Sequence, residues 1–327
     1  MGTVTQADPA VPAGSADPLA LRRPLGDRGF QVLAAAAGLL VLVILVLIAV
    51  STTQQASSWF STAGLSGIFS TNWDPAANKF GALPFIYGTA ITALIAIVIA
   101  VPLSVGVALL LTEVVPRRWA RPIVYVIDLL AVVPSVVWGL WGIIVFAPWV
   151  QGIYSSIASG VNGIPVLGSL FGPPVSGASF FTAGIILAIM TTPIVTSLSR
   201  EVIATVPVMD KEGAYALGAT RWEVIRGAVW PHSQGGVVGA VLLGLGRAMG
   251  ETIAAALVIG ASPTITSHLF GTGYSMPSVI ANQFGEATGE FRAALIGLGV
   301  LLFVITIIIN LLARGIVERS ARRTRGA

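Results

Sequence analysis

The chain has 327 residues, of which 55% are hydrophobic and 10% charged, and its formal net charge is +4. Soluble domains carry about 25% charged residues, so this composition excludes a soluble globule. The sequence contains no cysteine, which excludes disulfides and thiolate metal sites. Its two histidines, His232 and His268, lie far apart and predict no metal site. The basic residues flank apolar runs instead of forming one patch, which argues against nucleic-acid binding.

The N-terminal part of the chain predicts a polar tail followed by a membrane span. Residues 1–20 are rich in Ala, Pro, Gly and Asp and lack apolar periodicity, so we expect residues 1–28 to form a disordered cytoplasmic tail. The apolar run from Phe30 to Val50 follows it. A secretory signal peptide has an apolar core of about 7–15 residues, and this run is longer. We therefore interpret it as an uncleaved span.

Five further apolar runs predict an all-α membrane domain over residues 29–318, with about six transmembrane helices. Each run is long enough to cross the hydrocarbon core as a helix, which takes about 20 residues. The expected spans are 30–50, 86–111, 123–146, 180–198, 237–260 and 293–312. A basic cytoplasmic tail is expected at 319–327. The outer segment 147–179 has no charged residue, and both an interface-lying segment and a loop packed on the helices remain open.

The Lys and Arg residues predict the orientation of these spans. With the N-terminus inside, the inner segments hold fifteen of them and the outer segments hold two, Lys79 and Arg292. Cytoplasmic loops of membrane proteins carry such an excess of positive charge. Both termini are therefore expected in the cytoplasm, with an even number of spans between them.

The longest charged inner segment, residues 199–236, predicts a short helix, a sharp bend and a second helix that enters the membrane. Asp210 follows Pro207 and is a suitable N-cap for the first helix. Gly218 comes directly after Leu217, where a glycine is suited to end a helix.

This segment resembles the coupling loop of ABC importer permeases, in which Glu-Ala-Ala is followed at fixed spacing by Gly and then by Leu-Pro. The matching residues are Glu212, Ala214, Gly218 and Pro231. Gly213, Ala228 and Trp230 depart from the pattern. The resemblance implies that the loop docks in a groove of a separate ATP-hydrolysing subunit; a short amphipathic helix without such a role is the alternative. The expected coupling residues are Asp210, Lys211, Glu212, Gly213, Ala214, Gly218, Ala219 and Pro231.

Arg247 and Glu251 are charged residues near the middle of the fifth expected span. Four positions apart on a helix, they would share one face and pair. A charge at the bilayer centre costs about 2.5–3.5 kcal/mol, so charges retained there are commonly functional. Because a guanidinium binds an oxyanion through two parallel hydrogen bonds, we expect both residues on a substrate path. A purely structural ion pair is the alternative.

Asp128 is the only charged residue between Arg121 and Arg200, and it lies inside the third expected span. A role on the path and a pairing with a nearby basic residue are equally open for it. Pro134 removes a backbone hydrogen bond and should kink that span. Further candidates for the path are Pro134, Ser135, Thr191 and Thr192.

The resemblance to ABC importer permeases extends over nearly the whole chain, from about residue 28 to residue 318, and is strongest to the PstC family of phosphate-specific permeases. The stretches that carry it are 72–75, 80–89, 134–139, 205–209, 211–215 and 244–252. It implies inorganic phosphate as the substrate. In that family the residues that match Arg247 and Glu251 are implicated in transport.

The same resemblance implies partners and a location. The expected partners are a PstA-like second permease, a PstB-like ATPase dimer that binds ATP and Mg²⁺, an extracytoplasmic PstS-like phosphate-binding protein, and membrane lipid. The chain itself is expected to be no enzyme and to bind no cofactor or metal. The expected location is the bacterial cytoplasmic membrane.

Two alternatives to a phosphate permease of this type remain open. The first is a permease of the same class for molybdate or sulfate, or a PstA-type partner subunit; the outer stretch from Trp73 to Thr89 favours the PstC type. The second is a transporter or channel driven by an ion gradient. That class would leave the loop from Glu212 to Pro231 unexplained.

Overall fold

The computed structural model describes residues 25–325, with side chains from residue 29 to 315 except that of Leu65. The chain divides into two compact units, residues 1–51 and 52–327. Helix α1 (Leu25–Gln55) supplies the described part of the first unit, and its apolar side chains are exposed along its length. The tail expected at 1–28 lies outside the described residues as far as residue 24, and α1 begins directly after it.

The second unit is built from helices and one short hairpin, as far as the chain is described. Its elements in chain order are α2 (Ser57–Ile68), β1 (Trp73–Asp74), β2 (Lys79–Phe80), α3 (Leu83–Leu109), the π-helical turn η1 (Leu110–Val114), α4 (Arg117–Val132), α5 (Ser135–Trp141), η2 (Gly142–Phe146), α6 (Ala147–Val161), α7 (Pro165–Leu170), α8 (Phe180–Ala204), α9 (Val208–Ala216), α10 (Arg221–Val224), η3 (Ile225–Val229), α11 (Trp230–Gly250), α12 (Ile253–Val258), α13 (Met276–Gln283) and α14 (Gly289–Arg325).

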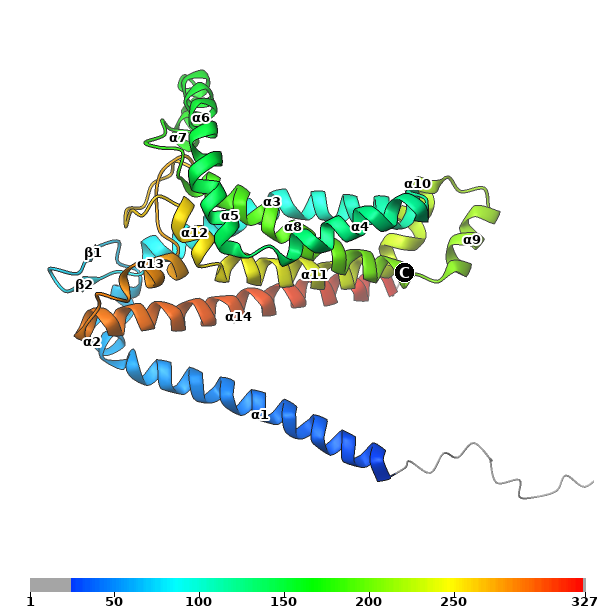
Figure 1. The fold of residues 1–327 in the computed structure, drawn as a ribbon, viewed down its shortest axis with the longest axis horizontal. Helices are drawn as coiled ribbons and strands as arrows, with labels where there is room; N and C mark the ends of the chain where they lie inside the picture. Colours follow the sequence, from blue (N-terminus) through cyan, green and yellow to red (C-terminus); the bar gives the residue numbers. More distant parts are fainter. Residues whose placement is uncertain (1–24, 326–327) are drawn as a thin grey trace, which may run out of the picture. The chain divides into compact units, whose positions relative to one another are not determined.

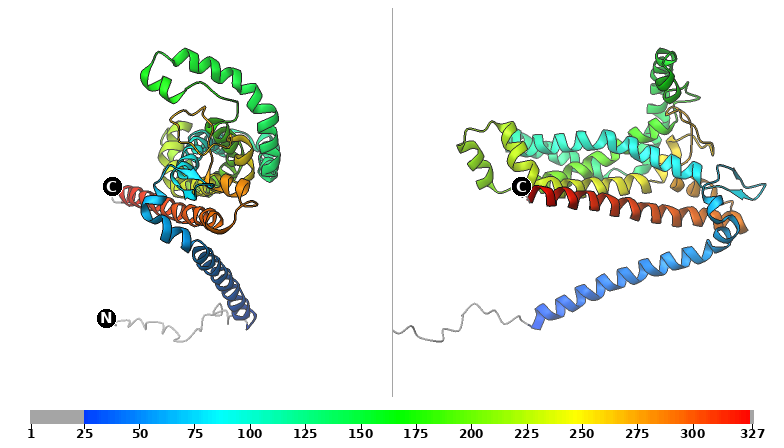
Figure 2. Two further views of the ribbon diagram at one scale, coloured as in Figure 1. Left: turned by 90° about the vertical axis from the view of Figure 1, so that its left-hand side faces the viewer. Right: turned by 180° about the vertical axis from the view of Figure 1, so that it is seen from behind.

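Helices α3, α8 and α11 pack against one another and form the centre of this unit, with α4 along α8 and α14 along α11 (Figures 1 and 2). Small residues make the close approach possible. A Cβ atom added at Gly244 of α11 would lie 2.5 Å from Cγ2 of Val195 on α8. Gly184 of α8 faces Ile95 of α3 in the same way. The glycines of these helices therefore set how closely the central backbones pack.

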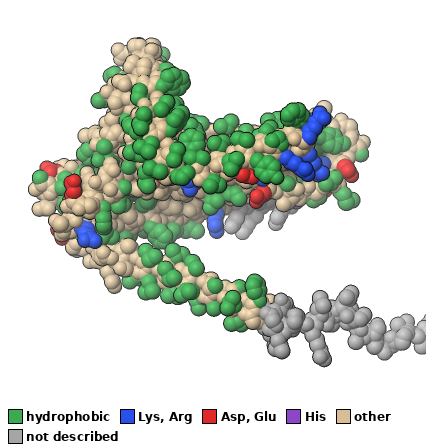
Figure 3. Space-filling model, in the orientation of Figure 1, with side chains coloured by type: hydrophobic (Ala, Val, Ile, Leu, Met, Phe, Trp, Pro, Cys, Tyr) green, Lys and Arg blue, Asp and Glu red, His purple; other side chains and the backbone are tan. Residues whose placement is uncertain are grey.

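The side chains on the surface of this bundle agree with a multi-pass membrane protein. Figure 3 shows hydrophobic side chains along the sides of the bundle, and Lys and Arg gathered at the end that carries α9 and α10. Five helices within the described residues are long and apolar enough to cross a membrane, over 29–55, 83–114, 135–161, 180–204 and 289–315. This confirms the all-α polytopic fold, with about six spans as an approximate number.

Two of the expected spans are broken helices: the disturbance expected at Pro134 in 123–146 is a complete break, and the break in 237–260 was not expected. In the first, α4 ends at Val132 and α5 begins at Ser135, with Val133 extended at ψ 125°. Proline disfavours the helical conformation in the residue before it and has no N–H to donate, so the sequence Val133-Pro134 ends the helix. In the second, α11 ends at Gly250 and α12 starts at Ile253, with two residues between them.

The uncharged outer segment 147–179 contains the helices α6 and α7. Helix α6 lies across the direction of the central helices (Figures 1 and 2). It buries Val150 and Tyr154 against Phe270, and its exposed face carries Trp149 and Ile153. The question left open by the sequence is therefore answered by a helical segment that packs through one face on the loop after α12.

An aromatic cluster joins the outer ends of several helices to the hairpin. The indole of Trp73 donates a hydrogen bond to Oε1 of Gln283 at 3.1 Å, and its ring lies edge-on to those of Phe80 and Phe85 and contacts that of Phe291. These residues come from the hairpin, α3, α13 and α14. This hairpin was not predicted, because two-residue strands carry no alternating pattern.

We predict that Trp73→Ala lowers stability by about 3–5 kcal/mol, the usual effect of removing a large buried aromatic side chain. Trp73 is 7% exposed, whereas Trp149 is 66% exposed. The thermal midpoint of the detergent-solubilised protein measures the loss of stability. It is obtained from the fraction of protein that still elutes as a folded peak on size-exclusion chromatography after heating. Trp149→Ala is the matched control and should leave the midpoint nearly unchanged; equal midpoints for the two variants would contradict the assigned role.

Candidate functional site

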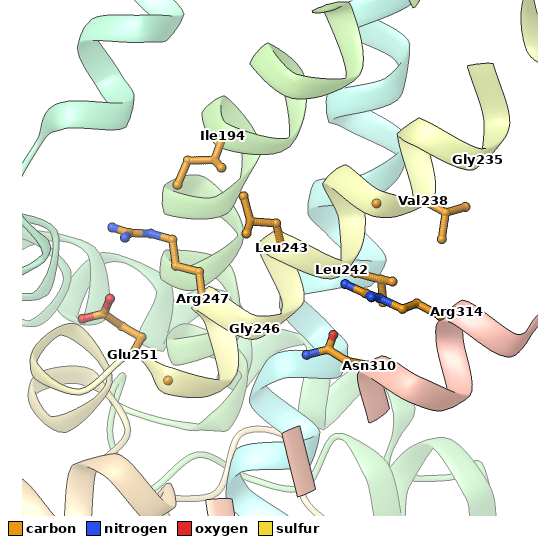
Figure 4. A pocket seen from close by; sticks show the side chains of 12 residues that line it. Ile194, Gly235, Val238, Leu242, Leu243, Gly246, Arg247, Glu251, Asn310 and Arg314 are labelled. Atoms are coloured by element: carbon orange, nitrogen blue, oxygen red, sulfur yellow. The ribbon is translucent and has the colours of Figure 1, made fainter. Parts of the chain in front are cut away.

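A groove of about 930 Å³ runs beside helix α11 and is bordered on its other side by α14 (Figure 4). Four glycines of α11 line it, and a Cβ atom at any of them would meet nothing within 4 Å; they are Gly235, Gly239, Gly246 and Gly250. The charged or amide side chains that line it are Arg247, Glu251, Asn310 and Arg314. The groove is thus open because one face of α11 lacks side chains, and its polar residues come from two helices and the α11–α12 connection.

Arg247 and Glu251 both border this groove, yet not as the expected helical pair. Glu251 lies beyond the last residue of α11 with an extended backbone, φ −69° and ψ 125°. Its Oε1 accepts a hydrogen bond from the backbone N–H of Ala254 at 3.4 Å, in the first turn of α12. Figure 4 shows the two side chains on the same side of α11. The expectation of a shared helix face was therefore wrong, because the helix ends between the two residues.

The guanidinium of Arg247 is exposed and makes no ion pair with any residue whose side chain is described. The Glu251 side chain is half-buried. A cation without a partner in the outer part of an apolar groove is available to an anion from outside the chain. The two residues stay predictions as path residues, and the groove is where the structure places them.

Asn310 and Arg314 were missed as site residues by the sequence reasoning. Both lie on α14, four positions apart, and both side chains line the groove. Arg314 had been counted only among the inner positive charges. The available signal was Asn310, an amide within the apolar run from Phe303 to Leu312. Sequence alone could not assign it to the groove, because nothing local indicates which neighbour α14 faces.

Asp128 lies away from the groove, on α4. Its Oδ1 accepts a hydrogen bond from the Ser197 hydroxyl of α8 at 3.2 Å. No basic side chain pairs with it among the described residues. Pro134 and Ser135 mark the break between α4 and α5, and α5 packs on α12, with Gly139 against Ala254. These residues determine the helix arrangement beside the groove and do not line it.

Thr191 and Thr192 lie on α8 within the helix packing. Thr191 is buried, and its methyl group faces Gly244 of α11. The Thr192 hydroxyl donates to the carbonyl of Ala188 at 2.8 Å, and its own carbonyl accepts from Ser104 of α3 at 3.1 Å. Both threonines thus contribute to contacts between the central helices, outside the lining of the groove.

The expected coupling segment forms the predicted helix, bend and second helix. Helix α9 ends through Gly218, whose φ of +84° lies in the left-handed region that glycine tolerates. The N–H of Gly218 donates to the carbonyl of Tyr215, and that of Ala219 donates to the carbonyl of Ala214. This double hydrogen bond is a Schellman motif. Helix α10 follows, and η3 leads into α11, in which Pro231 is the second residue.

The two helix starts in this segment differ from the expectation. Asp210 is not the N-cap of α9, which is Pro207; Asp210 is the third residue of the helix. The second start was missed: Thr220 and Glu223 form a capping box, with the Glu223 carboxylate accepting from the Thr220 N–H at 2.7 Å. This backbone bond, and then the Thr220 hydroxyl, lower the pKa of Glu223. The ionised Glu223 carboxylate therefore stabilises the start of α10 fully at pH values above the ordinary pKa of glutamate. This stabilisation is lost as the pH falls through the lowered pKa of Glu223.

An ion pair ties α9 to the inner end of α3. Nζ of Lys211 lies 2.6 Å from Oε1 of Glu113 in η1, and the two side chains are 19% and 9% exposed. Ala214 and Ala219 pack against the apolar cluster at the same end of the bundle. Glu113 was not expected at this site, because 98 residues separate it from Lys211.

The opposite face of α9 is exposed and apolar. Val208, Met209 and Leu217 are 65%, 81% and 91% exposed. Glu212 and Gly213 are exposed beside them. One face of this short segment is thus fixed to the bundle while the other presents apolar side chains outward, as a docking surface does.

Comparison with known proteins identifies the family. Residues 100–326 match the family described as binding-protein-dependent transport system inner membrane component. The chain is 44% identical over 328 aligned positions to the phosphate transport system permease protein PstC of Mesorhizobium japonicum, covering 99% of both chains. The chain belongs to this permease family. PstC of Haemophilus influenzae is 45% identical over 82% of this chain, and PstC 1 of Mycobacterium tuberculosis is 41% identical over 76%. These two alignments cover 86% and 75% of the relatives.

Solved structures show the same fold. A bacterial alginate ABC transporter, in complex with an alginate-bound periplasmic protein, contains a chain that matches with a TM-score of 0.57 at 14% identity. The match covers 91% of this chain and 98% of the other. An inward-facing MetNI methionine ABC transporter matches with a TM-score of 0.50 at 15% identity, over 76% of this chain and 99% of the other. At this identity the likeness concerns the fold alone, and it is that of ABC importer permeases.

We predict that Lys211→Glu and Glu113→Lys each lower stability by about 1–3 kcal/mol, because each removes the ion pair and places two like charges side by side at poorly exposed positions. The double variant exchanges the charges and should recover most of the loss. Thermal midpoints of the four proteins form a double-mutant cycle. Additive losses in the double variant would show that the two side chains do not interact.

Proposed function

We propose that this chain is a permease subunit of an ATP-driven, binding-protein-dependent importer that moves inorganic phosphate across the bacterial cytoplasmic membrane. The observation that carries the proposal is the similarity of the chain to PstC proteins over most of its length, together with an arginine in an open groove that has no ion-pair partner among the described residues. The alternative substrates that the sequence left open, molybdate and sulfate, are distinguished by the competition experiment below.

Arg247 is the residue proposed to bind the anion. Its planar guanidinium offers five N–H donors and stays protonated at any physiological pH. The carboxylate of Glu251, bordering the same groove, is held at the first turn of α12. A phosphate ion in the groove therefore meets a cation that no described carboxylate neutralises. Glu251 places a negative charge near the anion, which favours weak binding and release over retention.

Helix α9 and the bend at Gly218 are proposed to dock on a separate ATPase subunit, where ATP and Mg²⁺ are bound. The exposed residues Val208, Met209 and Leu217 support this role because they form an outward apolar face. Motion of α9 would reach the groove by two connections. One is the continuous chain through α10 and η3 into α11, and the other is the Lys211–Glu113 ion pair to α3.

The remaining proposed partners complete the path. A second, PstA-like permease would face the open side of the groove, because a groove bounded by α11 and α14 alone does not enclose an ion. A PstS-like binding protein would deliver phosphate to the outer face, where the hairpin, α6 and α13 lie. The excess of positive charge in the segments expected inside supports the proposal that the end with α9, and both termini, lie in the cytoplasm.

We predict that Arg247→Ala reduces phosphate uptake at least tenfold, because a charge-assisted hydrogen bond contributes about 1.5–3 kcal/mol. Arg247→Lys should retain part of the activity, since lysine keeps the charge without the bidentate geometry. Uptake of labelled phosphate, with sulfate and molybdate as competitors, in cells that depend on this chain measures both. Arg118→Ala, an exposed residue of α4, is the control. Uptake by Arg247→Ala at the wild-type rate would contradict the anion-binding role of Arg247. Competition by molybdate or sulfate would contradict the assignment of phosphate as the substrate.

We predict that Gly218→Val uncouples ATP hydrolysis from uptake. A Cβ atom at Gly218 meets nothing within 4 Å, so the effect is conformational. The left-handed conformation costs other residues about 1–2 kcal/mol, which disfavours the bend. ATPase activity and uptake of the complete importer in proteoliposomes measure the coupling. Gly227→Ala, where the added atom also has space and φ is not left-handed, is the control; unchanged coupling in Gly218→Val would contradict the docking assignment.

A further inference from the structure

The inner part of the groove is lined by Asn310 and Arg314 of α14 (Figure 4). Four positions apart, they lie on one face of their helix. Asn310 is half-buried and Arg314 is exposed. Neither side chain makes a hydrogen bond or an ion pair with a residue whose side chain is described. The groove thus presents donors from α14 as well as from α11.

Asn310 is the more informative of the two residues. The only other strongly polar side chain from Ala293 to Ala313 is Thr306, whose hydroxyl donates to the carbonyl of Leu302 at 2.7 Å within the same helix. An amide cannot satisfy both its donors and its acceptor in that way. Taking such a group out of water without a partner costs about 1–3 kcal/mol by mutational estimates. Asn310 is a polar side chain in a largely apolar part of α14, and it lines the groove. Its position there indicates a polar ligand.

The two arginines line the groove at different depths. Arg247 lies in the last turn of α11, next to the break at Glu251. Arg314 lies on α14, which packs along α11, and it is four residues closer than Asn310 to the C-terminal end of α14. Four residues of helix correspond to about 6 Å. Since the C-terminal part of α14 lies at the end of the bundle with α10 (Figure 1), Arg314 marks a position nearer to the proposed cytoplasmic side.

We propose that Arg314 and Asn310 form a second, inner binding station for the transported oxyanion, which it occupies after it leaves Arg247. The proposal rests on the proposed function and adds residues to its path. The guanidinium and the amide N–H groups supply donors that suit a phosphate group. A single strong site would hold the anion, whereas two sites at different depths allow it to move inward in steps.

The same donors suit the phosphate group of a lipid, because arginines near helix ends reach the headgroup region. Both ligands offer a phosphate oxyanion, which belongs to a lipid in one case and to the transported ion in the other. A lipid headgroup would make Arg314 an anchor whose effect depends on anionic lipid. A transported anion would make the effect independent of lipid charge and sensitive to a negative charge at residue 310.

The test uses the complete importer in proteoliposomes, with labelled phosphate as the probe. Asn310→Asp keeps the shape of the side chain and replaces an N–H donor by a negatively charged acceptor. We expect uptake to fall at least tenfold, in vesicles of phosphatidylcholine alone and in vesicles that also contain phosphatidylglycerol. Asn162→Asp, on the exposed outer segment, is the matched control and should transport like the wild type. Uptake by Asn310→Asp within twofold of the wild type would overturn the inner station.

A second variant covers the case in which Asn310→Asp fails to assemble. Arg314→His replaces a permanent charge by one that titrates near pH 6.5. If residue 314 binds the anion, uptake by this variant should fall several-fold, relative to the wild type, as the pH on the ATPase side rises from about 6 to about 8. Arg118→His, at the same end of the bundle and outside the groove, should follow the wild type. The proposal would be overturned if uptake by Arg314→His had the same pH dependence as uptake by the wild type. It would also be overturned if uptake by this variant fell only in vesicles that contain phosphatidylglycerol.

The outcomes also separate this inference from the proposed function. If the wild-type importer takes up no phosphate, the proposed function fails. If it takes up phosphate and loses this activity in Arg247→Ala, yet not in Asn310→Asp or Arg314→His, the function stands and the inner station fails.

Discussion

The carboxylate of Glu251 accepts a hydrogen bond from the first turn of α12, at the helix break beside the groove. A helix break inside a membrane leaves backbone N–H groups without partners, and each must be satisfied locally. Glu251 satisfies one of them. Because the carboxylate is engaged there and its backbone is extended, it does not stack over Arg247 as a helical neighbour would. The guanidinium is left available in the groove.

The two broken segments of the bundle support each other. Pro134 ends α4 and lets α5 start in a new direction, and α5 then packs on α12, the short helix whose Ala254 N–H donates to Glu251. Gly139 makes this contact possible, since a Cβ atom there would approach Leu257 and Ala254 closely. A change at Pro134 would therefore act on the groove indirectly, through the position of α12, although Pro134 itself lies outside the lining.

The inner end of the bundle connects the docking segment to the same groove. Helix α9 is held by the Lys211–Glu113 ion pair on η1, and the Gly218 bend leads by way of α10 and η3 into α11. The two helices that receive these connections, α3 and α11, also pack on each other and on α8. A displacement of α9 would thus reach the helix that carries Arg247 through packed elements. The glycines at these contacts allow the helices to pack closely.

The sequence by itself determined the class of fold, the approximate number of spans, the helix–bend–helix of the inner loop and two of the three charged residues of the groove, Arg247 and Glu251. These follow from signals that are local: apolar run length, the left-handed tolerance of Gly218, and the rarity of Arg247 and Glu251 within a span. Pro134 predicted a disturbance of the third span, though not its complete break.

Only the tertiary structure decided which residues face one another. The Lys211–Glu113 pair joins positions 98 residues apart, and Asn310 reaches the groove because α14 packs along α11. Thr191, a candidate for the path by sequence, is instead buried against Gly244. The end of α11 before Glu251 was likewise not predicted: Gly250 stands there, but glycines recur along α11 without ending it. Local propensity sets where a helix can form, whereas the contacts between helices decide where it stops and which side chains meet.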